Sequence, residues 1–252
     1  MKAIPYYDDQ RFDYRSYWLT REYESQAEKI ALKKLLKLIP QKENLIDIGA
    51  GYGRFVPLYA FLFKKCLLVE PSGKLLNDAR LMAKSYPHLE FLKSYVEKLP
   101  LKDKSFQVAI LIRVAHHLKD LETMVMEVHR ILKPGGFFIL EFANKRHLKN
   151  CLEAMLKLNF SFFTSHLPED LKTKAHSYPF YNYHPNQIKT LLLSNGFTIK
   201  KALSVSNFRH PFLKKIMPLK TLLWLEDKRQ NLTQNLKFHL GPSIFVLAQK
   251  KK

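Results

Sequence analysis

Short apolar segments alternate with amphipathic segments along most of this chain, and that alternation constrains its fold more than any other feature. The apolar segments have the length of buried strands, and the segments between them place apolar residues at helical spacing. Strands that alternate with helices favour a mostly parallel sheet with helices on both faces. The sequence therefore predicts an α/β protein with strands over residues 44–49, 66–70, 89–97, 106–112, 137–144 and 243–250.

The helices predicted between these strands have recognisable ends. Pro40 ends the first helix, Pro134 follows a later one, and Gly196 closes the last. The predicted helices cover residues 22–39, 52–63, 72–86, 121–133 and 185–195.

The length of 252 residues fits one α/β domain, and no repeat or low-complexity linker divides the chain. Within that single domain, 1–252, we expect four parts. They are an aromatic and helical N-terminal segment at 1–40, a core at 41–144, an aromatic insertion at 145–184, and a C-terminal helix with strands at 185–252.

Several classes of protein are excluded by composition. Cys66 and Cys151 are too few for a disulfide framework or a cysteine zinc site, and no His, Cys and Asp cluster has metal-ligand spacing. The first residues mix acids with tyrosines, unlike a signal peptide. The longest apolar stretch, 55–63, has roughly half of the ~20 residues that span a membrane. We therefore expect a cytoplasmic protein with no metal site and no membrane partner.

Positive charge is concentrated at the C-terminal end. The chain has 42 basic and 22 acidic residues, a net charge of +20, and residues 201–252 hold 11 basic and 2 acidic residues, or +9. A basic end would suit a phosphate-bearing partner such as nucleic acid. It is also typical of a lysine-rich surface kept soluble by like charge. Composition leaves both interpretations open.

A glycine cluster follows the first sheet strand. Of the eight glycines in the chain, three fall within five residues, at Gly49, Gly51 and Gly53. Glycine at such a turn permits a positive φ and lets a ligand approach the backbone, and the following helix start offers free N–H groups. The cluster therefore predicts a loop that binds a nucleotide cofactor.

The residues around this loop favour one class of nucleotide. Arg54 stands where the dinucleotide fingerprint requires its third glycine, and no lysine follows as in a phosphate-binding loop. Asp47 places a carboxylate at the mouth of the loop, where it would repel a pyrophosphate and suit a sulfonium or ammonium group. The charges thus favour S-adenosylmethionine over NAD.

The run NLIDIGAGYGRF resembles the first motif of the class I S-adenosylmethionine-dependent methyltransferases, of the small-molecule, methyltransferase domain 11-like type. In order, LLVEPS, VEKLPLKDKSFQVAILIRVAHHL, ILKPGGFFILEF and NGF resemble later motifs of that family, mainly over residues 40–144. The resemblance implies a Rossmann-like, doubly wound, mostly parallel sheet of seven strands, an N-terminal helical lid, and an insertion after the fifth strand.

The resemblance also implies the residues that bind the cofactor. Glu70, at the end of the second strand, would accept hydrogen bonds from both ribose hydroxyls. The implied cofactor-binding set is Asp47, Gly49, Ala50, Gly51, Gly53, Glu70, Pro71, Val96, Glu97, Arg113 and Tyr17.

Two positions depart from the family pattern. Tyr95 stands where the family often has an aspartate that contacts the adenine amino group, and Gln107 replaces a common aspartate in the fourth strand. The adenine contact then falls to the backbone of Val96, to packing by the tyrosine, or to Glu97.

The candidate catalytic residues follow the fourth strand, at the carboxyl edge where such sheets bind ligands. His116 or His117 could accept a proton from the methyl acceptor, or the pair could pack at the start of the next helix. Arg113 could face the methionyl carboxylate of the cofactor or the acceptor, or lie on the surface.

Aromatic residues near the N-terminus offer a second part of the site. Tyr14, Tyr17 and Trp18, with Arg21 beside them, could fold over the cofactor as a lid formed by residues 1–23, or could complete the core.

The aromatic insertion offers a third part. If it covers one end of the sheet, its residues 160–183, with His166 and His184, would shape the acceptor pocket.

The function predicted is methyl transfer from S-adenosylmethionine to a small-molecule acceptor, with anionic acceptors included. Two alternatives stay open: an RNA methyltransferase that uses the basic C-terminal region, and a non-catalytic module that binds the cofactor and a partner protein. Either a monomer or a homodimer fits the sequence.

Overall fold

The computed structural model describes residues 5–8, 13–86, 88–171, 179–232 and 239–252. Parts of the predicted lid and of the predicted insertion lie outside these residues.

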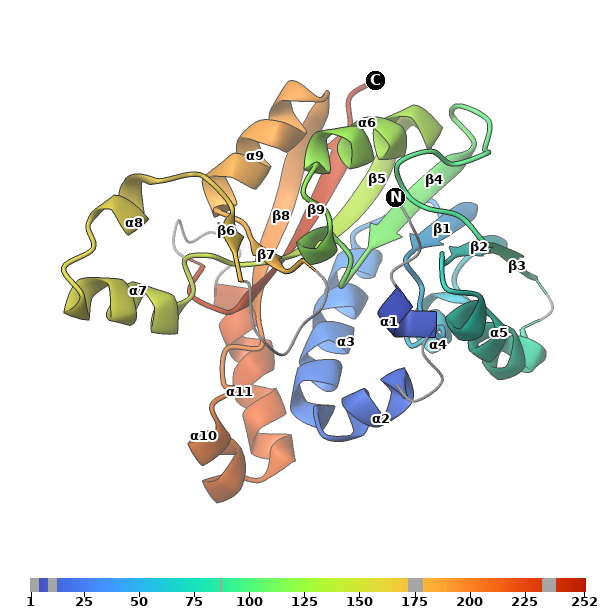
Figure 1. Ribbon diagram of the computed structural model, residues 1–252. Helices are drawn as coiled ribbons and strands as arrows, with labels where there is room; N and C mark the ends of the chain where they lie inside the picture. Colours follow the sequence, from blue (N-terminus) through green and yellow to red (C-terminus); the bar gives the residue numbers. More distant parts are fainter. Residues whose placement is uncertain (1–4, 9–12, 87, 172–178, 233–238) are drawn as a thin grey trace.

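A sheet of seven strands runs through the protein, in the order β3-β2-β1-β4-β5-β9-β8 (Figure 1). All neighbouring pairs are parallel except β5 with β9 and β9 with β8, so β9 alone runs against the others. The doubly wound, mostly parallel sheet predicted from the sequence is confirmed. The strands are β1 (Asn44–Ile48), β2 (Lys65–Val69), β3 (Leu89–Leu92), β4 (Phe106–Leu111), β5 (Leu132–Ala143), β8 (Phe197–Val205) and β9 (Ser243–Lys250).

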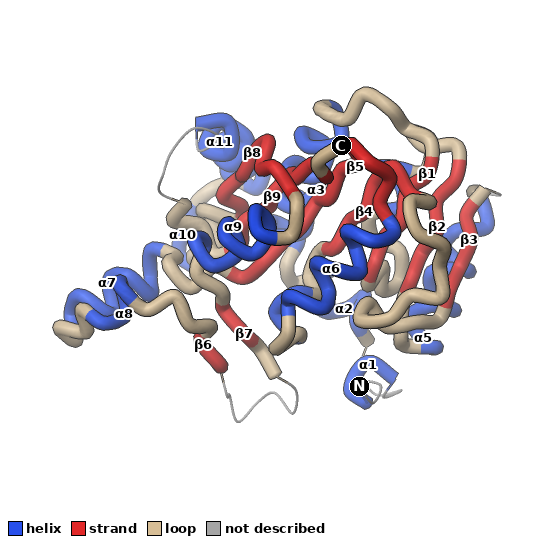
Figure 2. Tube along the Cα trace, turned by 90° about the horizontal axis from the view of Figure 1, so that it is seen from above, coloured by secondary structure: helices blue, strands red, loops and turns tan. Residues whose placement is uncertain are grey.

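Helices cover both faces of the sheet (Figure 2). The chain begins with α1 (Pro5–Asp8), α2 (Tyr14–Leu19), α3 (Glu22–Lys37), α4 (Val56–Tyr59), α5 (Gly73–Met82) and α6 (Leu121–Ile131). The later helices are α7 (Leu148–Leu156), α8 (Ser161–Thr164), α9 (Pro185–Ser194), α10 (Pro211–Ile216) and α11 (Leu219–Leu232). Short 3₁₀ turns lie at Ala83–Ser85 and Ala115–His117, and β6 (Glu169–Asp170) pairs with β7 (Tyr181–Asn182).

The core has two halves, because successive strand residues point to opposite faces. On β1, Leu45 packs with the apolar residues of α3, α4 and α11, whereas Ile46 and Ile48 pack with those of α6 and α9. Both faces are buried, which explains why these strands are continuous apolar runs in the sequence.

The chain order of the sheet reverses between β1 and β4, and a crevice opens at such a point beyond the carboxyl ends of the strands. Gly49 directly follows β1, Glu70 directly follows β2, and Arg113 comes two residues after β4. The fold therefore gathers three predicted site residues at one edge.

Some elements differ from the prediction. The helix expected over 52–63 is limited to α4. Gly53 has a φ of +80°, which is outside the helical region, so the residues before Val56 form turns. The strand expected over 89–97 ends at Leu92. The sequence analysis did not identify β8, α10 or α11, whose apolar residues are interrupted by lysines.

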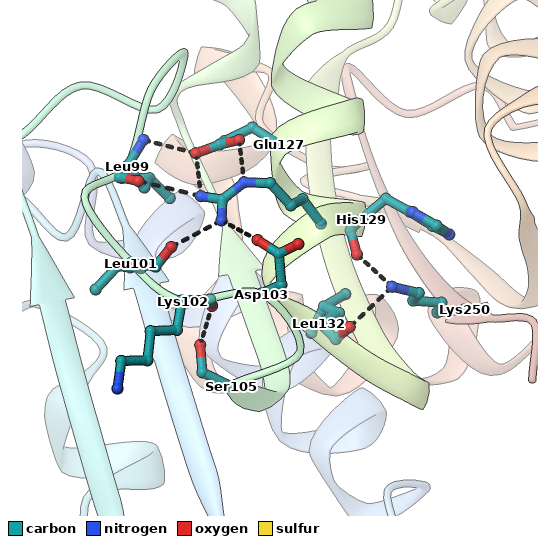
Figure 3. Close-up of polar contacts among 10 residues, drawn as sticks. Leu99, Leu101, Lys102, Asp103, Ser105, Glu127, His129, Leu132 and Lys250 are labelled. Atoms are coloured by element: carbon teal, nitrogen blue, oxygen red, sulfur yellow. Dashed lines mark hydrogen bonds and ion pairs between the residues drawn. The ribbon is translucent and has the colours of Figure 1, made fainter.

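The loop between β3 and β4 is held by one arginine of α6. Arg130 donates to the backbone carbonyls of Leu99 and Leu101 and to Asp103, while Glu127 accepts from the Leu99 N–H at 2.7 Å (Figure 3). These contacts fix the chain just after the predicted adenine-binding residues.

Candidate active site

A first cavity lies beyond the carboxyl ends of β1, β2 and β4. Its volume is about 860 Å³ when the space open to solvent is included. The loops that follow these strands line it, together with residues from the N-terminal segment. Its lining residues are Tyr7, Asp8, Tyr14, Ile48, Gly49, Gly51, Glu70, Pro71, Ser72, Leu75, Ser94, Tyr95, Val96, Glu97, Arg113, Val114, His117 and Leu118.

The three glycines of the loop have different roles: two line the cavity, and one allows close packing behind it. Gly49 and Gly51 line the cavity with φ values of +74° and +57°. A Cβ on Gly49 would lie 2.1 Å from Val114 Cγ2, so no larger residue fits there. Gly53 does not line the cavity; a Cβ on it would lie 2.6 Å from Met82 Cε, so this glycine permits close packing against α5.

Glu70 is the buried acid of the first cavity. Its Oε2 accepts from the Gly51 N–H and its Oε1 from the Ser72 N–H, each at 2.9 Å. Burial raises the pKa of Glu70 to about 7, although the two backbone bonds favour the carboxylate. A carboxylate has about four acceptor sites, so about two remain for groups inside the cavity.

Asp47 is not at the mouth of the loop, where we expected it. Its carboxylate lies on the opposite face of β1 from Ile46 and Ile48 and accepts from the Tyr59 hydroxyl at 2.8 Å. Burial raises the pKa of Asp47 to about 6. The pleat of the strand thus turns this side chain into the core, and it does not line the cavity. Ala50 is buried beside the cavity without lining it.

The predicted adenine end of the cavity comes from the chain after β3. Ser94, Tyr95, Val96 and Glu97 all line it, and Pro71 lines it from the loop after β2. Val96 is buried and lines the cavity, so it contributes apolar wall at this end. The departure at Tyr95 therefore leaves a tyrosine at the cavity wall.

Arg113 lies between the first cavity and a second one, and it lines both. Its backbone has a φ of +64°, and its N–H donates to Glu141 Oε2 at 2.8 Å. Its guanidinium donates to the Tyr17 hydroxyl at 3.4 Å and lies 4.0 Å from Glu28 Oε1, while its Nε has no hydrogen-bond partner among the described residues. The buried Glu28 and Glu141 raise the pKa of Arg113 and keep it charged.

The two histidines after β4 have different surroundings. His117 lines the first cavity; its Nε2 lies 3.0 Å from the Tyr7 hydroxyl and its Nδ1 lies 3.2 Å from the carbonyl of Pro179. A carbonyl can only accept, so Nδ1 carries the hydrogen and Nε2 is the basic nitrogen. His116 lines neither cavity; its ring packs 4.5 Å from that of Phe180, and burial holds its pKa well below the usual value.

The N-terminal aromatics cover the glycine loop. Tyr7 and Tyr14 line the first cavity, and the Tyr14 ring stacks on Tyr17 with centroids 5.9 Å apart. Trp18 is buried, with the guanidinium of Arg54 3.6 Å from its ring centre. Tyr17, expected among the cofactor-binding residues, lines the second cavity instead.

The second cavity measures about 1010 Å³ to its open mouth. It is lined by Tyr17, Trp18, Arg21, Glu24, Glu28, Arg113, Ala143, His147, Leu171, Phe180, Asn182, Ser206, Arg209, Pro242 and Ser243.

The acids of this second cavity are paired, and two of its cations are not. Glu24 accepts from Lys214 Nζ at 3.0 Å, and Glu28 pairs with Arg54. Among the described residues, Arg21 and Arg209 form no ion pair within 4 Å, although the charge of Glu24 acts on Arg209. Burial and the charge of Arg113 lower the pKa of Arg209, which remains a cation.

The insertion contributes less to the site than the sequence suggested. Phe180 and Leu171 line the second cavity. His184 instead accepts from the Asn186 N–H at the start of α9, and the His166 ring lies 4.4 Å from it. Neither histidine lines the first or the second cavity. Residues 172–178 of the insertion lie outside the described part of the chain.

Two lysines of the basic C-terminal region are used internally. Lys250 Nζ donates to the carbonyls of His129 at 2.6 Å and Leu132 at 2.9 Å (Figure 3), and Lys214 pairs with Glu24. These two charges therefore stabilise the fold. Residues 233–238 lie outside the described part of the chain.

The residues after β8 that line the second cavity were not predicted from the sequence. Ser206 and Arg209 follow β8 at the same edge of the sheet as Gly49 and Arg113. The signal was the apolar content of residues 197–205; recognition of that segment as a strand would have placed the following loop at the site.

Comparison with known proteins agrees with this fold. A family model described as a methyltransferase domain matches residues 46–140. The demethylmenaquinone methyltransferase of Chlorobaculum tepidum is 28% identical over 191 residues, which cover 74% of this chain and 76% of that protein. A demethylmenaquinone methyltransferase of Chlamydia trachomatis is 32% identical over 107 residues, covering 40% of this chain and 45% of that protein.

Solved structures share the fold. An S-adenosylmethionine-dependent methyltransferase from Thermotoga maritima has a TM-score of 0.62 at 22% identity, covering 94% of this chain and 95% of that one. Another, from Mesorhizobium loti, has a TM-score of 0.60 at 16% identity, covering 86% and 96%. Among the described residues, no helix is both long and apolar enough to cross a membrane.

Proposed function

We propose that this chain, whose residues 46–140 match a methyltransferase-domain model, transfers a methyl group from S-adenosylmethionine in the first cavity to a small anionic acceptor bound in the second cavity. The observation that carries this proposal is the position of Arg113, whose side chain lines both cavities. A donor in the first cavity and an acceptor in the second would meet at this residue.

The residues of the first cavity fit S-adenosylmethionine. Glu70 retains acceptor capacity for the ribose hydroxyls, and Gly49 and Gly51 leave the space that side chains would fill. Val96 and Tyr95 offer apolar surface for the adenine. When bound, the cofactor supplies a methyl group activated by a positive sulfur, so the protein's main task is to hold donor and acceptor in line.

The charges of the second cavity favour an anionic acceptor. Its acids Glu24 and Glu28 are already in ion pairs with Lys214 and Arg54, whereas Arg21 and Arg209 form no ion pair within 4 Å among the described residues. A carboxylate or another anionic group would pair with these guanidinium groups, which bind planar oxyanions through two parallel hydrogen bonds. Phe180 and Tyr17 would cover the apolar part of such a molecule.

His117 is the proposed proton acceptor. With Nδ1 holding its hydrogen toward Pro179, Nε2 can take a proton from the Tyr7 hydroxyl 3.0 Å away. Tyr7 and His117 line the first cavity and not the second, so Tyr7 would accept the substrate's proton only where the reacting group extends past Arg113 into the first cavity. His116 has no comparable contact with either cavity, so we assign it a packing role.

A labelled-methyl assay tests the proposal. The purified chain is incubated with labelled S-adenosylmethionine and with the acidic fraction, the neutral fraction and the total RNA of a cell extract. We expect label in the acidic fraction, and we expect Arg209→Gln to lower kcat/KM about tenfold or more, the scale of one hydrogen bond to a charged group. Cofactor affinity, measured by calorimetry, should stay unchanged.

Lys215→Gln is the matched control, because it removes one positive charge from the exposed surface near Arg209 without touching either cavity. It should transfer methyl groups at the wild-type rate. Label in the neutral fraction or in RNA, or an Arg209→Gln variant as active as the wild type, would contradict an anionic acceptor.

A further inference from the structure

Of the 18 large apolar side chains that are exposed among the described residues, seven fall within one short segment, residues 148–167, which contains α7 and α8. Each of seven such residues is at least half exposed. They are Leu148 (53%), Leu152 (50%), Met155 (56%), Leu156 (85%), Leu158 (74%), Phe160 (70%) and Leu167 (74%), and we call this set the apolar patch. An exposed apolar concentration of this kind marks an interaction surface.

The patch begins on α7. The apolar residues of this helix cover more of its surface than the side that packs on the protein. Cys151 and Ala154 face the body of the protein and are buried. The four exposed residues of this helix recur at i, i+4, i+7 and i+8, which places them together on an adjacent arc. The helix therefore presents a second apolar surface that the described residues leave uncovered.

The turn after α7 is hydrogen-bonded, so it presents its apolar side chains in fixed positions. Asn159 N–H donates to the Ala154 carbonyl at 2.9 Å, and Asn159 Oδ1 accepts from Ser161 and Phe162. Leu158 has a φ of +52°, a conformation that asparagine or glycine adopts more easily.

The other end of the patch is tied to the body by a buried cation. Lys145 Nζ donates to the carbonyls of Ser165 at 3.1 Å and Leu167 at 2.9 Å, and it lies 5.6 Å from the Phe162 ring centre. Both views show α7 and α8 projecting from the side of the molecule (Figures 1 and 2). A broad, flat partner can reach this projection without meeting the rest of the protein.

Charge identifies the partner. The chain carries a net charge of +20, so a second copy of the chain would be repelled, whereas an anionic surface would be attracted. Beside the patch stand the cations Arg146, Lys149 and Lys157. Glu153 pairs with Lys149 at 3.6 Å, so of these three cations Arg146 and Lys157 are without an ion pair among the described residues; the acids Glu169 and Asp170 follow the patch in the sequence.

A second exposed apolar group lies on α10, where Phe212 is 61% and Ile216 is 56% exposed, next to the exposed Lys215. Both elements begin beside the second cavity: its lining residue His147 is the N-cap of α7, and Arg209 directly precedes the N-cap of α10. Both apolar groups therefore lie on helices that start next to residues lining the second cavity.

From these observations we propose that the apolar patch docks on the surface of a bilayer that contains anionic lipids. The leucines and Phe160 enter the boundary between headgroups and acyl chains, and the cations beside them meet the lipid phosphates. The sequence led us to expect no membrane partner because it contains no spanning segment. A peripheral contact needs no such segment.

Vesicle sedimentation tests this proposal with the full chain. We expect binding to mixed phosphatidylcholine and phosphatidylglycerol vesicles that weakens with salt, and little binding to phosphatidylcholine alone. Leu152→Gln with Leu156→Gln should lower the partition coefficient about tenfold or more, because each buried leucine contributes on that scale.

The matched control is Leu81→Gln with Met126→Gln, which removes two apolar side chains of similar exposure, 59% and 57%, from α5 and α6. It should bind vesicles as the wild type does, and circular dichroism should show both double variants folded. Three results would overturn the proposal: no binding to the mixed vesicles, equal loss in both variants, or a patch variant that changes only the oligomeric state in sedimentation velocity. Methyl transfer in the absence of vesicles is measured separately, so a failure here leaves the proposed reaction untouched.

Discussion

The carboxylate of Glu70 accepts a hydrogen bond from the backbone N–H of Gly51 at 2.9 Å, which joins the end of β2 to the glycine loop after β1. The same carboxylate accepts from Ser72 N–H, at the start of α5. One buried acid thus holds two loops of the first cavity in place and still has acceptor sites that face a ligand.

Replacement of this acid should weaken cofactor binding. Glu70→Gln keeps the size of the side chain but turns an amide NH₂ toward one of the two backbone donors or toward the ribose. Calorimetry should show S-adenosylmethionine binding weaker by about 1.5–3 kcal/mol, the scale of hydrogen bonds to a charged group. Glu90→Gln, on the exposed side of β3, is the control and should bind normally. Unchanged affinity in Glu70→Gln would refute the ribose assignment.

The same carboxyl group should make the stability of the ligand-free protein depend on pH. Its pKa is about 7 in the folded chain, above the ordinary 4.5, so the native state holds a proton that the unfolded state releases. The free energy of unfolding should therefore fall by about 3 kcal/mol as pH rises from about 4.5 to about 7, with a smaller further change above that. Urea titrations across this range should show the slope, and Glu70→Gln should reduce it. The pKa of Asp47 is also raised, to about 6, so this residue adds a pH dependence of the free energy of unfolding that remains in Glu70→Gln.

Two aromatic variants test whether the N-terminal segment acts as a lid over the cofactor or only completes the core. Tyr14 lines the first cavity, 3.5 Å from where a Cβ on Gly51 would lie, whereas Trp18 is buried. Tyr14→Ala should weaken cofactor binding about threefold to tenfold, because an aromatic face attracts a cation. Trp18→Ala should instead lower the melting temperature. If Tyr14→Ala changes only the melting temperature in parallel calorimetry and dichroism melts, the N-terminal segment is part of the core and no lid.

RNA binding by the C-terminal region should be weak. Lys214 and Lys250 make internal contacts, which leaves fewer lysines to meet phosphates. On single strands, five phosphate contacts would give a slope of about −3.5 for log affinity against log salt. We expect a much shallower slope in a gel-shift titration with total RNA. Tight, salt-sensitive binding that is lost when Lys214, Lys215 and Lys220 become alanine would instead favour the RNA methyltransferase alternative.

The alternation of strands and helices was predictable because periodicity is a local property. A buried parallel strand is a continuous apolar run, and 44–49, 66–70 and 137–144 are such runs. In residues 197–205 two adjacent lysines, Lys200 and Lys201, interrupt the apolar side chains of this edge strand, so β8 was not recognised. Since Arg209 lies in the loop after β8, the missed strand also hid one wall of the second cavity.

The sequence by itself determined the sheet, the glycine loop and the position of Glu70, because each depends on residues that are adjacent along the chain or at the ends of successive strands. Only the tertiary structure decided which side chains share a cavity. The pleat of β1 turns Asp47 into the core, and the folded chain brings Tyr7 to His117 and Arg209 to the same cavity as Tyr17. These pairs are about 100 or more residues apart, and no local pattern of charge or hydropathy records such a contact, which exists only once the sheet has set the distance between its loops.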